Sequence, residues 1–384
     1  MLRYLLFSIS LIVCSCGTKN LDKEARNIEV NLENLTPFKS SQLFSSVEIT
    51  PLETTKESLL TRIDKLIPYK ELYYLLDQDQ GQITIFNKAG KYVKKIAREG
   101  QGPGEYGKLS DMVLDQMTEQ LELLSPDGKV NVYSLDGEWI EDYTIPDLRS
   151  VHLMEIINQD LRTVYSKDSR LEHNLAYYSK SKNELVFKTH TNTSIFEENA
   201  ITLSRSPFKK ADNSILFCTP FTNEIYILAP EGMKLLSTWN FGKYNPNFKQ
   251  LNGIDEPAHE VFIEKFLEEI GSSFVSFSNY VENKDLIFFQ LPFKKGPGTF
   301  VIAKEKMNII PLQLFPYEAV HLLDNEILAV SDPDFLRLYL RDDPFISAQI
   351  GSIAYINKDD NPVILRFKLE DISKLQPNLP VIQK

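Results

Sequence analysis

Short apolar segments, rather than long helical faces, dominate the chain from about residue 45 onward. They are clearest at 72–76, 83–86, 121–124 and 130–133, where residues such as Ile, Val, Leu and Tyr gather in runs or alternate with polar ones. Runs of this length between Gly-, Asp- and Asn-containing turns indicate β-strands. The pattern therefore predicts an all-β protein.

One strand–turn–strand unit recurs along the chain. Residues 83–93 and 130–140 match at an offset of 47 positions, and residues 225–235 form a weaker third copy. Each copy carries a glycine in its turn, where a tight hairpin needs a positive φ. The hairpin-turn glycines are Gly90, Gly137 and Gly232. Since another apolar run precedes each copy, a unit holds at least three strands.

Units of 40 to 50 residues with about four strands each are typical of β-propeller blades. We predict one six-bladed propeller over residues 41–384, with seven blades as the less favoured alternative. Short helical insertions are expected between blades. One is predicted over 257–270, where Phe262, Phe266 and Ile270 share a helical face behind Pro257, and another within 332–350.

The stretch EGQGPGEYGKL at 99–109 contains G-x-G-x-x-G, the pattern of dinucleotide-binding loops. In those loops the motif opens a helix whose N-terminus faces the pyrophosphate. Here the apolar runs at 109–114 and 121–124 are too short for that helix, and Pro103 removes one amide. We therefore expect no bound dinucleotide. The glycines are expected to form a tight crossover between blades, with positive φ at Gly102 and Gly104. The crossover residues are Gly100, Gly102, Pro103 and Gly104.

The N-terminus predicts a lipoprotein signal peptide over residues 1–15. Arg3 precedes an apolar run at 4–13, which is shorter than the roughly 20 residues of a membrane-spanning helix. The sequence from Val13 to Cys16 resembles a bacterial lipobox, which implies cleavage before Cys16 and acylation of that residue. An ordinary secretory peptide is the alternative. We expect residues 16–40 to comprise the lipidated cysteine and a polar tether.

These signals predict a lipid-anchored protein of the bacterial cell envelope, in the outer membrane, with its membrane face left open. The net charge of the 384-residue chain is −11, which disfavours nucleic acid as a partner because phosphate backbones are repelled. With Cys16 acylated, Cys218 has no partner for an intramolecular disulfide. Its apolar neighbours at 214–218 indicate a buried small hydrophobe.

No catalytic constellation is evident in the sequence. The histidines lie apart, without the H-x-x-x-H spacing of metal ligands, and G-x-S-x-G, H-E-x-x-H and P-loop motifs are missing. The histidines are His152, His173, His190, His259 and His321. We therefore expect no catalytic residue, no metal ligand and no cofactor. The acidic pairs Asp332/Asp334, Asp342/Asp343 and Asp359/Asp360 are interpreted as turn and capping residues.

Several segments together resemble a known family. The stretch 96–106 is similar to the linker of NHL-type propellers, and the chain resembles the six-bladed β-propeller lipoproteins of Bacteroidota. The wider resemblance rests on 50–55, 73–77, 83–86, Asp111 and a closing strand at 360–369. The resemblance implies a β-propeller fold and a location in the cell envelope, but it implies no particular reaction and no catalytic residues. By analogy with other propellers, a calcium ion in the central channel remains open.

Two functions follow from this pattern. The first is a non-catalytic binding module for a glycan, a peptide or a partner envelope protein. The second is a lyase or hydrolase with its site at the channel mouth. A cluster of His, Arg and carboxylates at one mouth would favour the enzyme, and an aromatic or featureless mouth would favour binding. Four tyrosines could belong either to the core or to a binding groove: Tyr73, Tyr106, Tyr133 and Tyr280.

Overall fold

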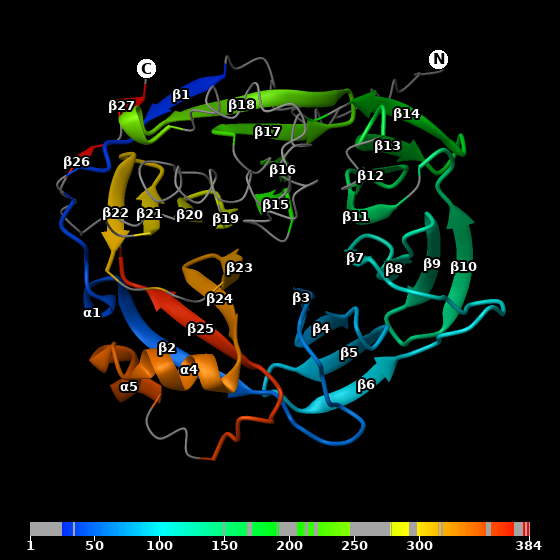
Figure 1. Ribbon diagram of the computed structural model, residues 1–384, viewed down its shortest axis with the longest axis horizontal. Helices are drawn as coiled ribbons and strands as arrows, with labels where there is room; N and C mark the ends of the chain where they lie inside the picture. The colour runs from blue at the N-terminus through cyan, green and yellow to red at the C-terminus, as the bar shows by residue number, and fades with distance from the viewer. Residues whose placement is uncertain are drawn as a thin grey trace, which may run out of the picture.

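The computed structural model describes residues 25–33, 35–148, 150–166, 171–189, 191, 206–211, 214–218, 222–245, 277, 279–291, 298–313, 315, 318–350, 355–371, 379–380 and 382–383. Within these residues, strands form a ring of sheets (Figure 1). Two expected features lie outside the described residues: the signal peptide with Cys16, and the helix over 257–270. His190 and His259 also lie outside them.

Three four-stranded antiparallel sheets follow one another along the first half of the chain, each built from consecutive strands. The first contains β3 (Lys65–Tyr69), β4 (Leu72–Asp77), β5 (Gln82–Asn87) and β6 (Tyr92–Ile96). The second contains β7 (Asp111–Asp115), β8 (Gln120–Leu124), β9 (Lys129–Ser134) and β10 (Trp139–Thr144). The third contains β11 (Val151–Ile156), β12 (Leu161–Ser166), β13 (Leu175–Ser179) and β14 (Glu184–Thr189).

An eleven-stranded sheet follows, and it combines two further groups of four consecutive strands. One group is β15 (Phe208–Ala211), β16 (Ser214–Phe217), β17 (Glu224–Ala229) and β18 (Gly232–Asn240). The other is β19 (Asn279–Glu282), β20 (Leu286–Gln290), β21 (Thr299–Ala303) and β22 (Asn308–Leu312). A single parallel pair, Ala211 with Glu282, joins the two groups. The sheet is extended at its edges by β1 (Arg26–Glu29), β26 (Leu379–Pro380) and β27 (Ile382–Gln383).

The last sheet closes the ring with strands from both ends of the chain. It contains β23 (Glu318–Leu323), β24 (Glu326–Ser331) and β25 (Val363–Leu369), followed by β2 (Phe44–Pro51). β2 and β25 run antiparallel from the pair Phe44–Leu369 to the pair Pro51–Val363. The segment expected to be a closing strand at 360–369 therefore contains β25, which pairs with β2 from the first part of the chain.

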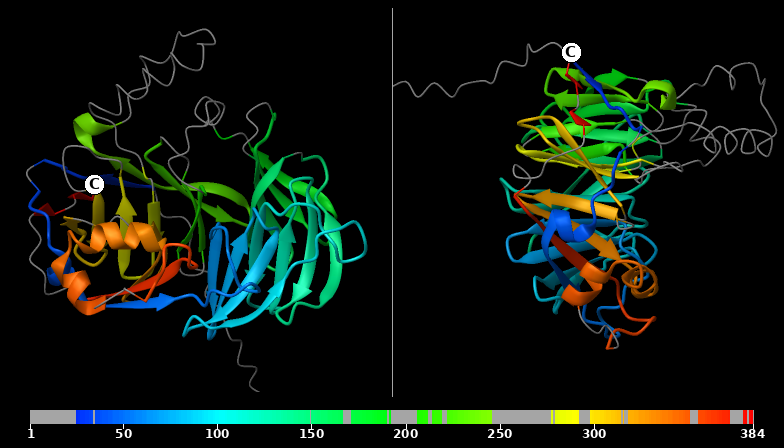
Figure 2. Two further views of the ribbon diagram at one scale, coloured as in Figure 1. Left: turned by 60° about the horizontal axis from the view of Figure 1, so that its bottom comes forward. Right: turned by 90° about the vertical axis from the view of Figure 1, so that its left-hand side faces the viewer.

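The sheets surround one axis, which identifies the fold as a β-propeller. In Figure 1 the strands nearest the centre are β3, β7, β11, β15, β19 and β23, each the first strand of its group. The edge-on view in Figure 2 shows a flattened disc. Because consecutive strands run outward from the axis, the first strand of each group can present side chains to the centre.

Apolar side chains fill the space between neighbouring groups of strands. Between the first two sheets, for example, Leu76 and Ile85 pack in one buried cluster with Met112 and Leu123. Five other clusters lie in the same way between successive groups, including one between the last sheet and the first. Burial of apolar area drives this stacking. A sheet buried on both faces explains why β4 and β5 are almost continuously apolar.

The repeat corresponds to the outer hairpin of each group, β5–β6, β9–β10 and β17–β18. Gly90, Gly137 and Gly232 in these turns have φ of 76°, 84° and 129°. At Gly90 a Cβ would also lie 2.2 Å from the carbonyl oxygen of Pro51. Glycine is therefore required there both by the backbone and by its neighbour on β2.

The domain begins earlier than the sequence suggested, so the expected tether over 16–40 is too long. β1 pairs in parallel with β18, from Arg26–Ser237 to Glu29–Asn240. Phe38 forms an isolated bridge with Leu312. The segment is polar in sequence, but Ile28, Val30 and Leu32 are buried against the eleven-stranded sheet. Backbone pairing and these three side chains attach it to the propeller.

Four short helices accompany the strands among the described residues: α1 (Ser40–Leu43), η1 (Gly242–Tyr244), α4 (Pro333–Leu340) and α5 (Pro344–Ile350). α4 and α5 fall within the insertion expected at 332–350. Leu336 and Leu340 form the buried face of α4, one helical turn apart. Asp343 caps α5, since its carboxylate accepts bonds from the amides of Phe345 and Ile346 at 3.0 and 3.1 Å.

Candidate functional site

Two features of the described residues combine chemistry with access to solvent: a charged cluster on the innermost strands and a cleft beside α4. The cluster, which we call the axial cluster, consists of Lys65, Asp111, Glu155, Lys210 and His321. These residues come from β3, β7, β11, β15 and β23. The propeller geometry thus gathers side chains that are widely separated in sequence.

Ion pairs connect the axial cluster across successive strands. Lys65 Nζ lies 3.0 Å from Asp111 Oδ1 and 3.1 Å from Glu155 Oε1. Lys210 Nζ lies 3.5 Å from the other oxygen of Glu155, and its side chain is 41% exposed. The Asp111 carboxylate also accepts bonds from the amides of Met112 and Met154, both at 2.9 Å. The positive charges of the two lysines therefore compensate the negative charges of Asp111 and Glu155.

The environment shifts the pKa values of these groups in different directions. Burial raises the pKa of Asp111 despite the nearby charge of Lys65. Burial opposes ionisation of Glu155, but the charges of Lys210 and Lys65 outweigh it and lower the pKa of that carboxyl. Burial also opposes the charge of Lys65, whereas Asp111 and Glu155 outweigh burial and raise its pKa.

His321 joins the last sheet to the first. Its Nε2 lies 3.1 Å from the carbonyl oxygen of Leu66 on β3. The strand pairing shifts register between Ala319 and His321, as at a β-bulge, which is a device that re-aims a side chain. Burial, and then the positive charge of Lys210, lower the pKa of His321 to about 4. Near neutral pH the imidazole is therefore uncharged.

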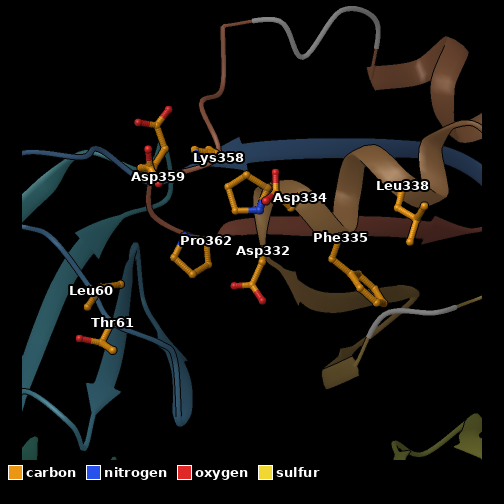
Figure 3. Close-up of a pocket in the computed structure, with 11 residues that line it drawn as sticks. Leu60, Thr61, Asp332, Asp334, Phe335, Leu338, Lys358, Asp359 and Pro362 are labelled. Atoms are coloured by element: carbon orange, nitrogen blue, oxygen red, sulfur yellow. The ribbon is translucent and has the colours of Figure 1, made fainter.

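The second feature is a cleft of about 650 Å³ at the rim, between the start of the first sheet, α4 and the segment 358–362 (Figure 3). We call it the rim cleft. Its lining residues are Leu60, Thr61, Asp332, Pro333, Asp334, Phe335, Leu338, Lys358, Asp359, Asp360 and Pro362. Its volume is within the range of small-ligand sites.

Hydrogen bonds fix two walls of the rim cleft to each other. The side chain of Asn361 accepts a bond from the Leu60 amide at 2.8 Å and donates to the carbonyls of Glu53 and Ser58, both at 2.9 Å. The Thr61 amide donates to Asp77 at 2.6 Å. Arg337 of α4 donates to the Ile356 carbonyl. The walls are therefore positioned by bonds that leave most lining side chains uninvolved.

The rim cleft is acidic. Four aspartates line it against one lysine. Asp334 lies 3.5 Å from Arg337, and Asp360 accepts the Asn357 amide at 2.7 Å in a turn. Thus Asp360 is a turn residue, as expected, while Asp332 opens α4 through its carbonyl, which accepts the Leu336 amide at 2.9 Å. The sequence did not indicate that these two pairs face one cavity.

The crossover loop connects β6 to β7, so the G-x-G-x-x-G motif precedes a strand rather than a helix. Within it, Glu105 accepts the Gly102 amide at 2.8 Å, and Tyr133 donates to the Gly104 carbonyl at 2.6 Å. Of the two glycines expected to have positive φ, only Gly104 does, at 71°. Gly102 instead uses its amide to hold the Glu105 carboxylate.

The remaining candidate residues lie in the core or on the surface. All four of the tyrosines left open in the sequence are buried, among them Tyr73, which accepts a bond from Arg366 at 2.7 Å. Cys218 is buried with its thiol unpaired, and burial raises its pKa to about 12. His173 lies 3.5 Å from Glu172. In the part of the chain that the structure describes, no three His, Cys, Asp or Glu side chains are arranged to hold a metal ion.

Sequence reasoning missed both the axial cluster and the rim cleft. A signal for the first existed, because Lys65, Asp111 and Glu155 recur at intervals of 46 and 44 residues, close to the repeat length. Charged residues recurring at the repeat length in otherwise apolar first strands point to the axis. The rim cleft had no comparable signal, since its walls come from segments about 270 residues apart that only ring closure brings together.

None of the helices among the described residues is both long enough and apolar enough to span a membrane.

Comparisons with known proteins identify relatives in fold and family. The profile of a family described as "Domain of unknown function (DUF4934)" matches residues 24–368. A solved structure from Bacteroides fragilis, described as an exported protein, superposes with a TM-score of 0.68 at 16% identity, covering 90% of this chain and 99% of that one. A DUF4221 member from Bacteroides vulgatus gives 0.50 at 10%, covering 85% and 98%. No curated protein matches the chain. At these identities the structures inform on the fold alone.

Proposed function

We propose that this chain, which belongs to the family described as "Domain of unknown function (DUF4934)", is a binding module of the bacterial cell envelope. In this proposal Cys16 carries the lipid anchor and the propeller recognises a partner without transforming it. The envelope location is supported by the lipobox-like sequence at 13–16 and by the exported relative from Bacteroides fragilis. An anchor in the outer membrane and an origin in Bacteroidota belong to the same proposal.

The propeller is inferred to have six blades. Six groups of strands each contribute one innermost strand, and six apolar clusters separate them within the described residues. The last blade combines β2 with β23–β25, so the first and last parts of the chain interlock. The backbone pairing of β2 with β25 holds the ring closed at the junction between the first and last parts of the chain.

The rim cleft is the observation that carries the binding function. Phe335 and Leu338 stand on the outer side of α4, away from the buried Leu336 and Leu340. Phe335 is 37% and Leu338 57% exposed, and two apolar side chains that face solvent beside a formed cleft are consistent with a binding surface. The axial cluster, by contrast, uses its charges to connect neighbouring blades.

The position of the rim cleft suits a membrane-anchored protein. β1 pairs with β18 and α4 follows β24, so the group β19–β22 lies between them around the ring, and Figure 1 shows β1 at its top and α4 towards its bottom. β1 begins at Arg26, ten residues after Cys16, and an extended segment of that length spans about 35 Å. An anchor at Cys16 therefore leaves the rim cleft free to face away from the lipid.

A pull-down from envelope extracts, paired with glycan and peptide arrays, tests the binding function. Purified full-length protein should retain one class of ligand in a saturable manner. The matched control is a double variant that reverses charge in the cleft, Asp332→Lys with Asp359→Lys. Absence of any saturable ligand in both assays would contradict the proposal.

An enzyme remains the second candidate, because the axial cluster meets part of the geometric criterion set by the sequence. It brings a histidine together with two carboxylates whose pKa values are shifted in opposite directions, an arrangement found in acid–base sites. Its cations are lysines, and its charges pair with each other. Incubating envelope extract with wild type and with His321→Ala, followed by mass spectrometry of products, discriminates. A product formed only by wild type would favour the enzyme.

A further inference from the structure

We propose that the rim cleft docks a polypeptide segment in which basic residues flank an apolar side chain. This inference rests on the proposed binding function and names the chemistry of its partner. The occupant would be an extended or helical segment of another envelope protein. Two observations of the cleft support it: its uncompensated charge and its exposed apolar surface.

Charge is the first argument. The carboxylates of Asp332 and Asp359 have no hydrogen-bond or ion-pair partner within the described part of the chain. Both side chains are exposed, and Lys358 is the lone cation lining the cleft. Like charges held together without partners raise the free energy of the unbound protein, and a cationic ligand relieves this repulsion. The cleft therefore selects positive charge.

Apolar surface is the second argument. Phe335 and Leu338 lie three residues apart on α4, so they share one side of the helix, and Leu338 is 57% exposed. Figure 3 shows both side chains projecting from α4, with Leu60 and Thr61 on the other side of the cleft. Leu59 and Tyr355, next to the lining segments in sequence, are exposed as well. Exposed apolar side chains in the lining segments and close to them in sequence fit a chain segment better than a small cation.

The same observations disfavour other occupants. A second copy would bring another chain of net charge −11 against an acidic surface. An anionic lipid surface or a nucleic acid would be repelled by the four aspartates. A neutral glycan would leave Asp332 and Asp359 without compensation. These occupants become outcomes of the experiment.

Binding of synthetic peptides to the full chain in detergent, measured by calorimetry, tests the proposal. The probe is an eight-residue peptide with three lysines on each side of a Leu-Phe pair. Two comparison peptides replace the lysines by glutamates or the Leu-Phe pair by glycines. We expect the probe to bind about tenfold or more tightly than either, and its binding to weaken as salt rises. Equal binding of the three peptides, or none at millimolar concentration, would overturn the proposal.

Variants locate the binding. Asp332→Lys with Asp359→Lys should weaken the probe about tenfold or more, and Asp332→Asn with Asp359→Asn should give an intermediate loss. Leu338→Ser should weaken it through lost apolar contact. The matched control is Glu184→Lys with Glu231→Lys, which places the same charge change at exposed sites on other blades. Equal losses in the cleft and control variants would show nonspecific attraction and would overturn the proposal.

Further measurements distinguish failure of the peptide-docking proposal from failure of the proposed binding function. If the pull-down retains a partner equally with wild type and the cleft variants, binding stands and the cleft assignment falls. If the pull-down and arrays retain nothing, the binding function itself falls. Sedimentation that shows a dimer dissociated by the cleft variants would assign the cleft to a second copy, and an array hit confined to neutral glycans would assign it to sugar. Either result overturns the peptide assignment.

Discussion

Arg162 and Glu122 form a buried, two-point ion pair between the second and third blades. Arg162 Nε lies 2.8 Å from Glu122 Oε2, and Nη2 lies 2.7 Å from Oε1. Each side chain is 1% exposed. Burial opposes ionisation of Glu122, but the hydrogen bonds and charge of Arg162 outweigh it and lower the pKa of the carboxyl. The pair fixes how one blade lies on the next.

Removing one member of this pair should therefore be costly. Arg162→Met leaves the Glu122 carboxylate buried with Tyr143 and Lys180 as its remaining partners. We expect a loss of about 3–5 kcal/mol in the free energy of unfolding, measured in urea. The matched control is Arg62→Met, which breaks the Arg62–Asp64 pair, where Arg62 is 51% exposed. It should cost about 1 kcal/mol or less. Equal losses would contradict the assigned role.

The crossover loop gives a prediction at Gly104. An alanine there would hold φ near 71°, and its Cβ would lie 2.7 Å from Cγ of Trp139. Gly104→Ala should therefore destabilise the domain by about 1 kcal/mol or more. Gly107→Ala is the control, since nothing lies within 4 Å of its Cβ position. Thermal melts compare the two variants.

The same melts test whether the loop holds a nucleotide. Millimolar NAD or ATP should leave the Tm of wild type unchanged, because Glu105 already accepts the Gly102 amide. A ligand bound only to the native state would raise the Tm by mass action. A nucleotide-dependent rise that Gly104→Ala abolishes would overturn the structural interpretation of the loop.

His321 should make stability fall as the pH falls. The pKa is about 4 in the folded protein and about 6.5 in the unfolded chain. The unfolded chain therefore binds more protons between these values, so the contribution of neutral His321 is complete above pH 6.5 and is lost toward pH 4. Between pH 7 and pH 5 we expect a loss of about 2 kcal/mol at most. Urea unfolding at both pH values measures it, and His321→Gln should remove most of the difference. An unchanged pH dependence in the variant would show that other groups cause it.

The lipid anchor is tested by Cys16→Ala. The variant should lose labelling by a fatty-acid probe and should leave the membrane fraction, because acylation of Cys16 is the proposed attachment. A Cys14→Ala variant is the matched control and should retain both. Equal labelling of Cys16→Ala and wild type would contradict the anchor.

The sequence predicted the propeller because repetition and strand pattern are local signals. The 47-residue match between 83–93 and 130–140 marks equivalent hairpins, and Gly90 and Gly137 mark their turns. What it missed depends on long-range pairing. Nothing in the polar sequence around β1 indicated that it adds to β18 in parallel, because edge pairing uses backbone groups that every residue carries.

The candidate sites were less predictable for the same reason. Asp332 and Asp359 are ordinary turn residues in sequence, and they face one cavity only because β2 closes the ring beside β25. The Nε2 atom of His321 contacts the carbonyl oxygen of Leu66, which lies 255 positions away in sequence, so no local pattern could indicate this contact. Motif searches rely on spacing along the chain, whereas a propeller builds its sites from spacing around an axis.

Photocrosslinking in cells tests whether the rim cleft is the surface through which this protein binds its partner. A photoreactive residue is placed at Leu338, 57% exposed in the cleft, and in a separate variant at Met117, 72% exposed on another blade. We expect one partner protein to be crosslinked from Leu338 and not from Met117, and we expect this crosslink to be lost when Asp332 and Asp359 are changed to lysine. Equal crosslinking from the two positions, or crosslinking from Leu338 that survives the charge reversal, would contradict it.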